Sequence, residues 1–306
     1  MQQTSLSVVV PTRDRPALLG PCLESLRSSL RPEDELIVVD SASRDPVVAA
    51  VASAHGARVV RCERPGSSRA RNAGAAAAGR DVIAFVDDDV RVAVSWADGM
   101  AKTFEDASVA FVTGRVGVPP DQVATAERAV AVKDDAEPCR LDGRCIGVIG
   151  SSASFAIRRD ALARVGGFDE SLGPGGRLGV VEDLDLFDRL FAAGMVGRYE
   201  PAARAWHDQW RTRPQLLRMD WQYGRGAGAR LAKLVRTDPP GARSVASDVL
   251  WRGGVIAMLG ALRRGHEFGA ATIAVRLSGA AVGFSRALTV PVRDGHFAVS
   301  AGRATT

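Results

Sequence analysis

Residues 81–90 read DVIAFVDDDV, a short apolar run that ends in three consecutive aspartates. The run Val82–Val86 is β-branched-rich and short, which is typical of a buried strand in a parallel sheet. Open α/β sheets bind ligands beyond the carboxyl ends of their strands. A divalent metal that also holds substrate phosphates needs only one or two carboxylates there. We therefore expect a metal and a phosphorylated ligand at Asp87, Asp88 and Asp89, with a solvated acidic turn as the simpler alternative.

Strand-like and helix-like segments alternate strictly upstream of this run. Short apolar runs at Ser5–Val10, Glu35–Val39 and Ala57–Arg61 predict strands, and the segments between them predict helices, the first capped by Asp14. This alternation predicts βαβ units in an α/β fold with a doubly wound, mostly parallel, Rossmann-like sheet. Further along the chain we expect strands at Cys145–Ile157 and Arg198–Trp206, and helices at Arg159–Val165, from Glu182 to Phe191 and at Pro214–Val235.

Charge divides the chain into two parts. Residues 209–306 contain 15 Lys or Arg residues and 5 Asp or Glu residues, a net charge of +10, which leaves −5 for residues 1–208. We predict a catalytic domain at residues 1–210 and a basic, mainly helical C-terminal extension at residues 211–306. A basic extension suits an anionic surface. Its arginines are dispersed without interleaved aromatic side chains, so we expect no nucleic-acid partner.

The compartment is expected to be the cytoplasm. The first residues, MQQTSLSVVVPT, lack a basic leader region, no run of eighteen uncharged apolar residues occurs, and four cysteines fit a reducing environment. Two apolar segments, Val249–Leu262 and Phe268–Val290, are interrupted by arginines. They are expected either to lie peripherally on an anionic membrane or to pack back onto the catalytic domain. Cys139 and Cys145 flank a polar loop and are expected to be two thiols, a disulfide or metal ligands.

Polar residues collect where the predicted strands end. Thr12, Asp40 and the three aspartates from Asp87 all fall at one edge of the predicted sheet. Arg71 and Asn72 lie near the start of a helix whose N-terminus favours a phosphate. PTRDRP follows the first strand in place of G-x-G-x-x-G, which excludes a Rossmann dinucleotide site, and no P-loop is present. The pattern predicts a pocket for a nucleoside diphosphate.

Five segments in order and spacing resemble the inverting family 2 glycosyltransferases, which have the GT-A fold, over residues 5–207. The matching segments are VVVPTRDR (Val8–Arg15), IVVDSAS (Ile37–Ser43), GSSRARNAG (Gly66–Gly74), FVDDDV (Phe85–Val90) and VEDLDLFDRL (Val181–Leu190).

The resemblance implies a nucleoside-diphosphate sugar as the donor, with UDP, dTDP or GDP as its nucleotide, and Mn²⁺ or Mg²⁺ as the cofactor. It implies that Asp40 pairs with the nucleobase of the donor, although this chain has Ser41 where many members of the family carry a second acid. The implied donor-binding residues are Pro11, Thr12, Arg13, Asp40, Arg71, Asn72, Asp87 and Asp88. The implied metal ligands are Asp87, Asp89 and His207, for which a partly buried structural histidine is the alternative.

Inversion needs a metal that neutralises the departing diphosphate and a base that takes the proton of the acceptor hydroxyl. By the resemblance, Asp183 is the expected base and Glu182 positions it or the acceptor. The alternative is that both acids only suit the helix dipole. The glycine-rich segment Leu172–Gly179 is expected to be a mobile loop beside the site.

The expected activity is transfer of a single sugar to a hydroxyl acceptor. The acceptor is expected to be a lipid-linked or cell-envelope glycan precursor, or a small molecule. Residues 222–226, QYGRG, have the Gln and Arg spacing of processive synthases but lack their tryptophan, which argues against processive synthesis. Two other readings remain: a nucleotidyltransferase, whose usual glycine-rich basic loop is not found in PTRDRPALL, and a catalytically degenerate sugar-nucleotide-binding protein.

Overall fold

The computed structural model describes residues 4–123, 130, 132–143 and 149–298. They form two compact units. The first unit contains the chain up to Phe168 together with Leu186–Trp210, and the second contains Asp169–Asp185 together with the chain from Arg211 onward. Residues 169–185, which the sequence places in the catalytic domain, therefore cluster with the C-terminal residues.

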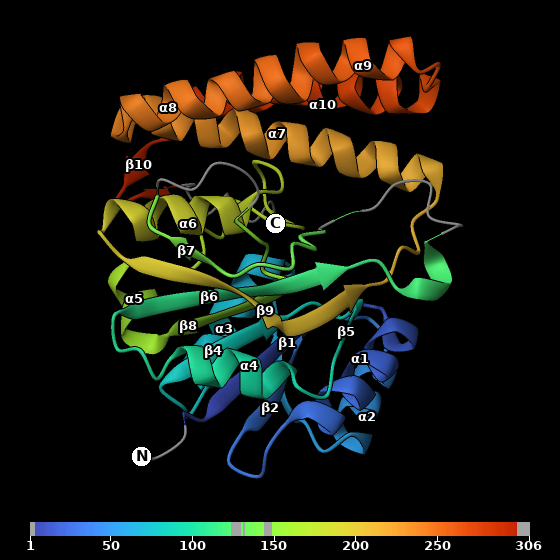
Figure 1. Cartoon of the computed structure of the whole chain (residues 1–306), viewed down its shortest axis with the longest axis vertical. Helices are drawn as coiled ribbons and strands as arrows, with labels where there is room; N and C mark the ends of the chain where they lie inside the picture. Colours follow the sequence, from blue (N-terminus) through green and yellow to red (C-terminus); the bar gives the residue numbers. More distant parts are fainter. Residues whose placement is uncertain (1–3, 124–129, 131, 144–148, 299–306) are drawn as a thin grey trace, which may run out of the picture. The chain divides into compact units, whose positions relative to one another are not determined.

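The first unit is built on one mixed sheet (Figure 1), in which the strands follow the order β3-β2-β1-β4-β8-β6-β9-β5, with β7 paired to β9. Strands β3, β2, β1 and β4 are parallel, as are β6 and β9, whereas β8 runs antiparallel to both β4 and β6. Strands β5 and β7 run antiparallel to β9.

The strands of this sheet are β1 (Leu6–Thr12), β2 (Glu35–Ser41), β3 (Arg58–Cys62), β4 (Val82–Val86), β5 (Val90–Val92), β6 (Val109–Gly117), β7 (Cys139–Leu141), β8 (Ser154–Arg158) and β9 (Val196–His207). The helices of the first unit are α1 (Pro16–Ser29), α2 (Val47–Ala54), α3 (Ser67–Ala77), α4 (Trp96–Thr103), the 3₁₀ turn η1 (Pro120–Gln122), α5 (Arg159–Arg164) and most of α6 (Glu182–Ala192).

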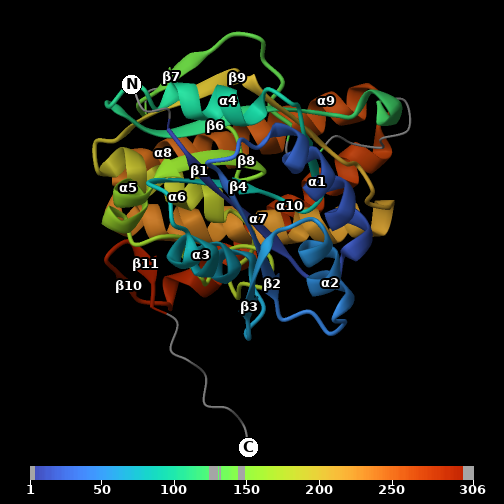
Figure 2. The same ribbon diagram turned by 90° about the horizontal axis from the view of Figure 1, so that it is seen from below.

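Strand β1 is apolar on both faces because helices cover both sides of it. Its even-numbered residues, such as Val8, belong to a core cluster with Leu23 and Leu26 of α1. Val9 points the other way, where Gly74 of α3 packs against its side chain. Figure 2 shows α1 and α3 on opposite sides of this part of the sheet. Two covered faces explain why the strand reads as a continuous apolar run.

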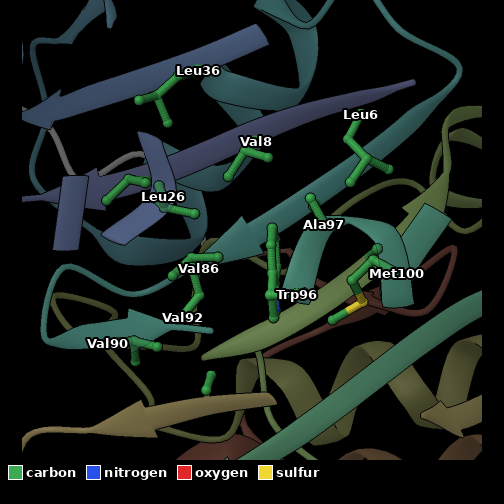
Figure 3. Close-up of a cluster of buried hydrophobic side chains, with 14 of the residues drawn as sticks. Leu6, Val8, Leu26, Leu36, Val86, Val90, Val92, Trp96, Ala97 and Met100 are labelled. Atoms are coloured by element: carbon green, nitrogen blue, oxygen red, sulfur yellow. The ribbon is translucent and has the colours of Figure 1, made fainter. Parts of the chain in front are cut away.

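The larger core lies on the α1 side of the sheet and continues under α4 (Figure 3). Its largest member is Trp96 of α4, which is fully buried. The indole Nε1 of Trp96 donates to the Ser154 hydroxyl of β8 over 2.9 Å, so burial leaves this donor satisfied. On the opposite face, Phe85, Phe111 and Phe187 belong to a chain of ring contacts that joins β4, β8, β6 and α6.

The second unit is mainly helical. Its elements are the start of α6, α7 (Arg213–Thr237), α8 (Pro239–Ala246), the π-helix η2 (Ser247–Ile256), α9 (Ala257–Arg263), α10 (Glu267–Leu288) and the hairpin of β10 (Val292–Arg293) and β11 (His296–Phe297). Helices α7 and α10 run side by side (Figure 1). A side chain at Gly224 or Gly228 of α7 would collide with backbone oxygens of α10, so glycine permits this close approach.

Three local expectations are wrong. Asp14 does not cap α1: Arg15 is the residue that precedes the helix, and Asp14 adopts a positive φ of 53°. Within 145–157 only Ser154 and the residues after it form a strand, because the backbone turns before them at Gly150 (φ 126°); residues 144–148 lie outside the described part of the chain. Strands β5 and β6 were not predicted. Cys22 and Cys62 are both buried.

Candidate active site

The carboxyl ends of β1 and β2 lie side by side, with Thr12 paired to Asp40 in the parallel register. Each strand is followed by a non-glycine residue with positive φ, Asp14 at 53° and Ala42 at 56°. The amide of Asp14 donates to the Ser43 hydroxyl over 2.9 Å, so the two loops hold each other. Such sparsely populated conformations persist where surrounding contacts determine them, and they cluster at functional sites.

Asp88, a buried acid of the triple aspartate that follows β4, contacts the end of β1 and the start of α1. Thr12 Oγ1 donates to its Oδ2 over 2.7 Å, and Arg15 Nη1 donates to its Oδ1 over 3.1 Å. Burial raises the pKa of Asp88 to about 6, the Arg15 cation opposes this rise, and the charge of Asp89 adds to it. The carboxylate therefore ties the end of β1 and the start of α1 to the end of β4.

Asp89 joins the acidic turn to the end of β9. Trp210 Nε1 donates to Asp89 Oδ2 over 2.8 Å, and His207 Nε2 lies 3.4 Å from Asp89 Oδ1. Asp89 and His207 are both buried. The guanidinium of Arg15 stacks over the Trp210 ring, 4.9 Å from its centroid, and has a side chain that is 40% exposed. Arg15 is thus a cation at the acidic turn that an anionic ligand can reach.

Asp87 pairs with α3. Arg71 Nη2 donates to Asp87 Oδ1 over 2.6 Å, and the guanidinium lies 5.5 Å from the centroid of the Phe168 ring. Arg71 is buried, whereas the Asp87 side chain keeps 28% exposure. Asn72 holds Phe168 from the same helix, because its amide donates to the Phe168 carbonyl and accepts from the Phe168 amide. Helix α3 therefore places Arg71 against the acidic turn, and the next residue, Asn72, fixes the position of Phe168.

Asp40 forms a further charged contact at this edge, with Arg61, which was not predicted as a site residue. Arg61 Nη1 donates to Asp40 Oδ2 over 2.5 Å, and the Ser43 amide donates to Asp40 Oδ1 over 2.9 Å. Burial acts to raise the pKa of Asp40, but the hydrogen bonds from Ser43 and Arg61 outweigh it and hold the pKa below its ordinary value. Asp40 is thus kept ionised as an acceptor.

The donor atoms at this edge fit a divalent cation. Carboxylate oxygens and an imidazole nitrogen suit Mn²⁺, and Asp89 Oδ1 and His207 Nε2 already converge. Within the described residues, no three Asp, Glu, His or Cys side chains are grouped closely enough to bind a metal by themselves. A cation that takes one or two protein carboxylates and fills its shell with substrate phosphates does not need such a group.

The predicted catalytic acids belong to the second unit. Glu182 is buried and Asp183 is half-buried in the first turn of α6, where Asp183 Oδ1 accepts from the Leu184 amide. The preceding glycine-rich segment is held by backbone hydrogen bonds: Gly173 donates to the Gly179 carbonyl over 2.8 Å, and Val180 donates to the Gln222 carbonyl over 3.0 Å.

The structure brings together six of the predicted site residues around the acidic turn: Thr12, Arg71, Asp87, Asp88, Asp89 and His207. Pro11 is a buried residue of β1, and the Arg13 side chain is 48% exposed next to Asp14.

Arg15, Arg61 and Trp210 were not predicted as site residues. A usable signal existed for each: Arg15 ends the PTRDR segment, Arg61 ends a predicted strand, and Trp210 closely follows His207.

The chain is similar in sequence to known glycosyltransferases. Residues 7–166 match the family model described as glycosyl transferase family 2. The chain is 33% identical over 224 residues to a pre-mycofactocin glycosyltransferase of Mycobacterium tuberculosis, covering 71% of this chain and 44% of that protein. It is 26% identical over 172 residues to an uncharacterized glycosyltransferase of Haemophilus influenzae, covering 55% of this chain and 57% of that protein. The chain thus spans less than half the length of the mycobacterial relative.

The fold is similar to that of a mannosyltransferase from Pyrobaculum calidifontis solved with GDP-Man and Mn²⁺. The TM-score is 0.55 at 20% identity, with 92% of this chain and 76% of that one covered. A mycobacterial protein of known structure gives a TM-score of 0.51 at 20% identity, with 73% of each chain covered. The predicted GT-A-type α/β fold with C-terminal helices is confirmed. By its family model, which matches more than half of its residues, the chain belongs to glycosyl transferase family 2.

Proposed function

We propose that this protein is a metal-dependent, inverting glycosyltransferase that moves one sugar from a nucleoside-diphosphate sugar to a hydroxyl acceptor. The observation that carries the proposal is the contact network at the ends of β1, β4 and β9. There, Arg15 and Arg71 contact an acidic turn that Trp210 and His207 hold from the other side. Cations and carboxylates interleaved in this way suit a diphosphate bound together with a metal.

The donor would enter along the edge formed by β1, β2 and β4. Arg61 and Ser43 keep Asp40 ionised, which suits a carboxylate that accepts hydrogen bonds from the nucleobase or the ribose of the sugar-nucleotide. Arg15 combines charge with exposure and would contact the diphosphate. The solved neighbour is a complex with GDP-Man, which supports including GDP beside UDP and dTDP as a candidate nucleotide.

Asp89 and His207 would hold the metal, with Asp87 able to join when its pairing with Arg71 loosens. The buried Asp89–His207 contact of 3.4 Å supports this assignment. A bound divalent cation supplies charge that neutralises the departing diphosphate. The protein would orient the metal ligand: the hydrogen bond from Trp210 to one oxygen of Asp89 fixes the orientation of this carboxylate.

For the transfer step we propose Asp183 as the general base, with Glu182 supporting it. The base takes the proton of the acceptor hydroxyl, the acceptor oxygen bonds to the anomeric carbon, and the bond to the diphosphate breaks with its electron pair on the diphosphate. The assignment rests on the VEDLDLFDRL motif, in which Asp183 lies in the first turn of α6. The acceptor chemistry required is a hydroxyl group.

A calorimetric titration of the full chain with UDP, dTDP and GDP, each with and without Mn²⁺, tests donor and metal together. We expect one nucleotide to bind tightly only when the metal is present. Folded protein that binds none of them would overturn the transferase assignment. Binding without any turnover of the sugar-nucleotide would favour a degenerate sugar-nucleotide-binding protein.

Asp89→Asn should strongly weaken the metal-dependent part of nucleotide binding, because the neutral amide lacks the negative charge with which the carboxylate attracts the cation. Asp98→Asn is the matched control, since Asp98 lies on α4 with a side chain that is 63% exposed. Circular dichroism of both variants checks the fold. Mn²⁺-dependent affinity that is unchanged in Asp89→Asn would contradict the metal assignment.

Asp183→Asn should retain nucleotide binding and lose transfer by roughly 10²–10⁴-fold, the usual contribution of general acid–base catalysis. Asp188→Asn, on the same helix, is the matched control and should keep near-normal turnover. Transfer is measured as nucleotide release in the presence of a hydroxyl acceptor. Normal turnover of Asp183→Asn would place the base elsewhere.

A further inference from the structure

The helix that comprises α8, η2 and α9 exposes large apolar side chains over much of its length. Only 17% of its most apolar stretch is buried, and its length and composition are sufficient to cross a membrane; the same holds for α10, which is 22% buried. Six exposed residues define what we call the apolar face: Leu250 (54%), Trp251 (59%), Val255 (43%), Ile256 (50%), Leu259 (49%) and Leu262 (58%).

Helical geometry places these residues on one side. Leu250 and Val255 are five positions apart within the π-helix η2, which is the hydrogen-bond spacing of that helix type and slightly more than one turn. Beyond η2, Leu259 and Leu262 follow at spacings of four and three, the repeat of an α-helix. Gly254 and Ala261, between them in sequence, are buried. The change of helix type thus keeps the apolar face in line while small residues face the rest of the unit.

Basic side chains border the apolar face. Arg263 and Arg264 end the helix and are exposed. Arg252 is 63% exposed and lies 3.5 Å from Asp248, itself 60% exposed. The C-terminal residues 209–306 carry the net charge of +10. Arginines beside an exposed apolar stripe complement phosphate headgroups above acyl chains, and an exposed tryptophan is typical of that boundary.

We propose that the apolar face of α8–η2–α9 docks this protein peripherally on a membrane that contains anionic lipids. The arginines contact the headgroups, and Trp251 and its apolar neighbours enter the boundary with the acyl chains. The ion pair of Arg252 and Asp248 argues against a spanning helix, because crossing would carry both charged groups into the hydrocarbon layer. This inference does not depend on the proposed glycosyl transfer.

Flotation of the full chain with lipid vesicles tests the proposal. We expect binding to vesicles of phosphatidylcholine mixed with phosphatidylglycerol, weak binding to phosphatidylcholine alone, and a loss of binding at high salt. Leu259→Glu combined with Trp251→Ser should lower the partition coefficient by at least about tenfold, since both side chains lose apolar contact with the bilayer. Val94→Glu is the matched control, because Val94 is 71% exposed on the first unit.

Three outcomes would overturn the proposal. The first is equal vesicle binding by the double variant and by Val94→Glu. The second is light scattering that shows a wild-type dimer, dissociated by the double variant, with no vesicle binding, which would make the apolar face an interface between copies. The third is protein that only detergent, and not alkaline carbonate, releases from membranes, which would indicate a spanning helix. Nucleotide titrations of the same variants keep failure of docking distinct from failure of the donor site.

Discussion

Lys233→Met removes the ammonium group that two buried carboxylates of the second unit share. Lys233 Nζ lies 2.7 Å from Asp169 Oδ2 and 2.6 Å from Asp185 Oδ1, and it donates to the Gly295 carbonyl over 2.8 Å. Three acceptors match the three N–H groups of the ammonium. The side chain of Lys233 is 5% exposed, and those of both aspartates are 2% exposed. Water therefore cannot replace the lost cation.

The expected cost follows from what the carboxylates can do. Either both stay ionised without a partner, or one takes up a proton. Protonating an aspartate of ordinary pKa at pH 7 costs about 4 kcal/mol, which is the most that neutralising one of the two carboxylates can cost. This value agrees with the roughly 3–5 kcal/mol of stability that is lost when one partner of a buried ion pair is removed. We expect Lys233→Met to lower the free energy of unfolding of the second unit by about 3–4 kcal/mol.

Urea unfolding followed by far-UV circular dichroism measures this loss, because the second unit is mainly helical. Lys102→Met, at an exposed position of α4, is the matched control and should change stability by less than about 0.5 kcal/mol. Adding Asp185→Asn to Lys233→Met should recover part of the loss. A decrease below about 1 kcal/mol for Lys233→Met would refute the reasoning.

Acid provides an independent check of the same cluster. Burial acts to raise the pKa of Asp169, but Lys233 and the Phe297 amide outweigh it and hold the pKa below its ordinary value. A depressed pKa contributes stability above the unfolded-state pKa, and this stability is lost as the pH falls through the folded-state pKa. In Lys233→Met the carboxylates favour protonation instead. The deficit of the variant should therefore shrink between neutral pH and about pH 4.

Two further predictions concern the first unit. Gly74→Ala should lower the free energy of unfolding by about 1–3 kcal/mol, because the added Cβ would collide with the side chain of Val9. Gly20→Ala is the control: no atom lies within 4 Å of the added Cβ, so this change should be neutral or stabilising by up to about 1 kcal/mol. Thermal unfolding compares the two variants, and equal shifts in their melting temperatures would contradict the packing argument. Trp210→Phe keeps an aromatic ring but removes the hydrogen bond to Asp89. The Mn²⁺-dependent affinity for the nucleotide should therefore fall about tenfold in the calorimetric titration. An unchanged affinity would show that this hydrogen bond does not orient the Asp89 carboxylate.

Local patterns in the sequence were sufficient for the first half of the fold. The strand Val82–Val86 has the predicted bounds because a central parallel strand is apolar on both faces and cannot extend into three aspartates. The helix that begins at Pro16 was recognised from its proline and its apolar spacing. Strand β6 escaped notice because its pairing partners, β8 and β9, lie far along the chain and only assembly brings them to it.

The sequence by itself determined the alternation of strands and helices, the acidic turn after β4 and the motifs of the family, since each of these features consists of residues that are consecutive in the chain. Only the tertiary structure decided the partners of those acids. Arg15, Arg61 and Trp210 contact Asp88, Asp40 and Asp89 because strand ends separated by up to 121 positions meet at one edge of the sheet. Burial and charge pairing are properties of that edge, and no single segment of the chain encodes them.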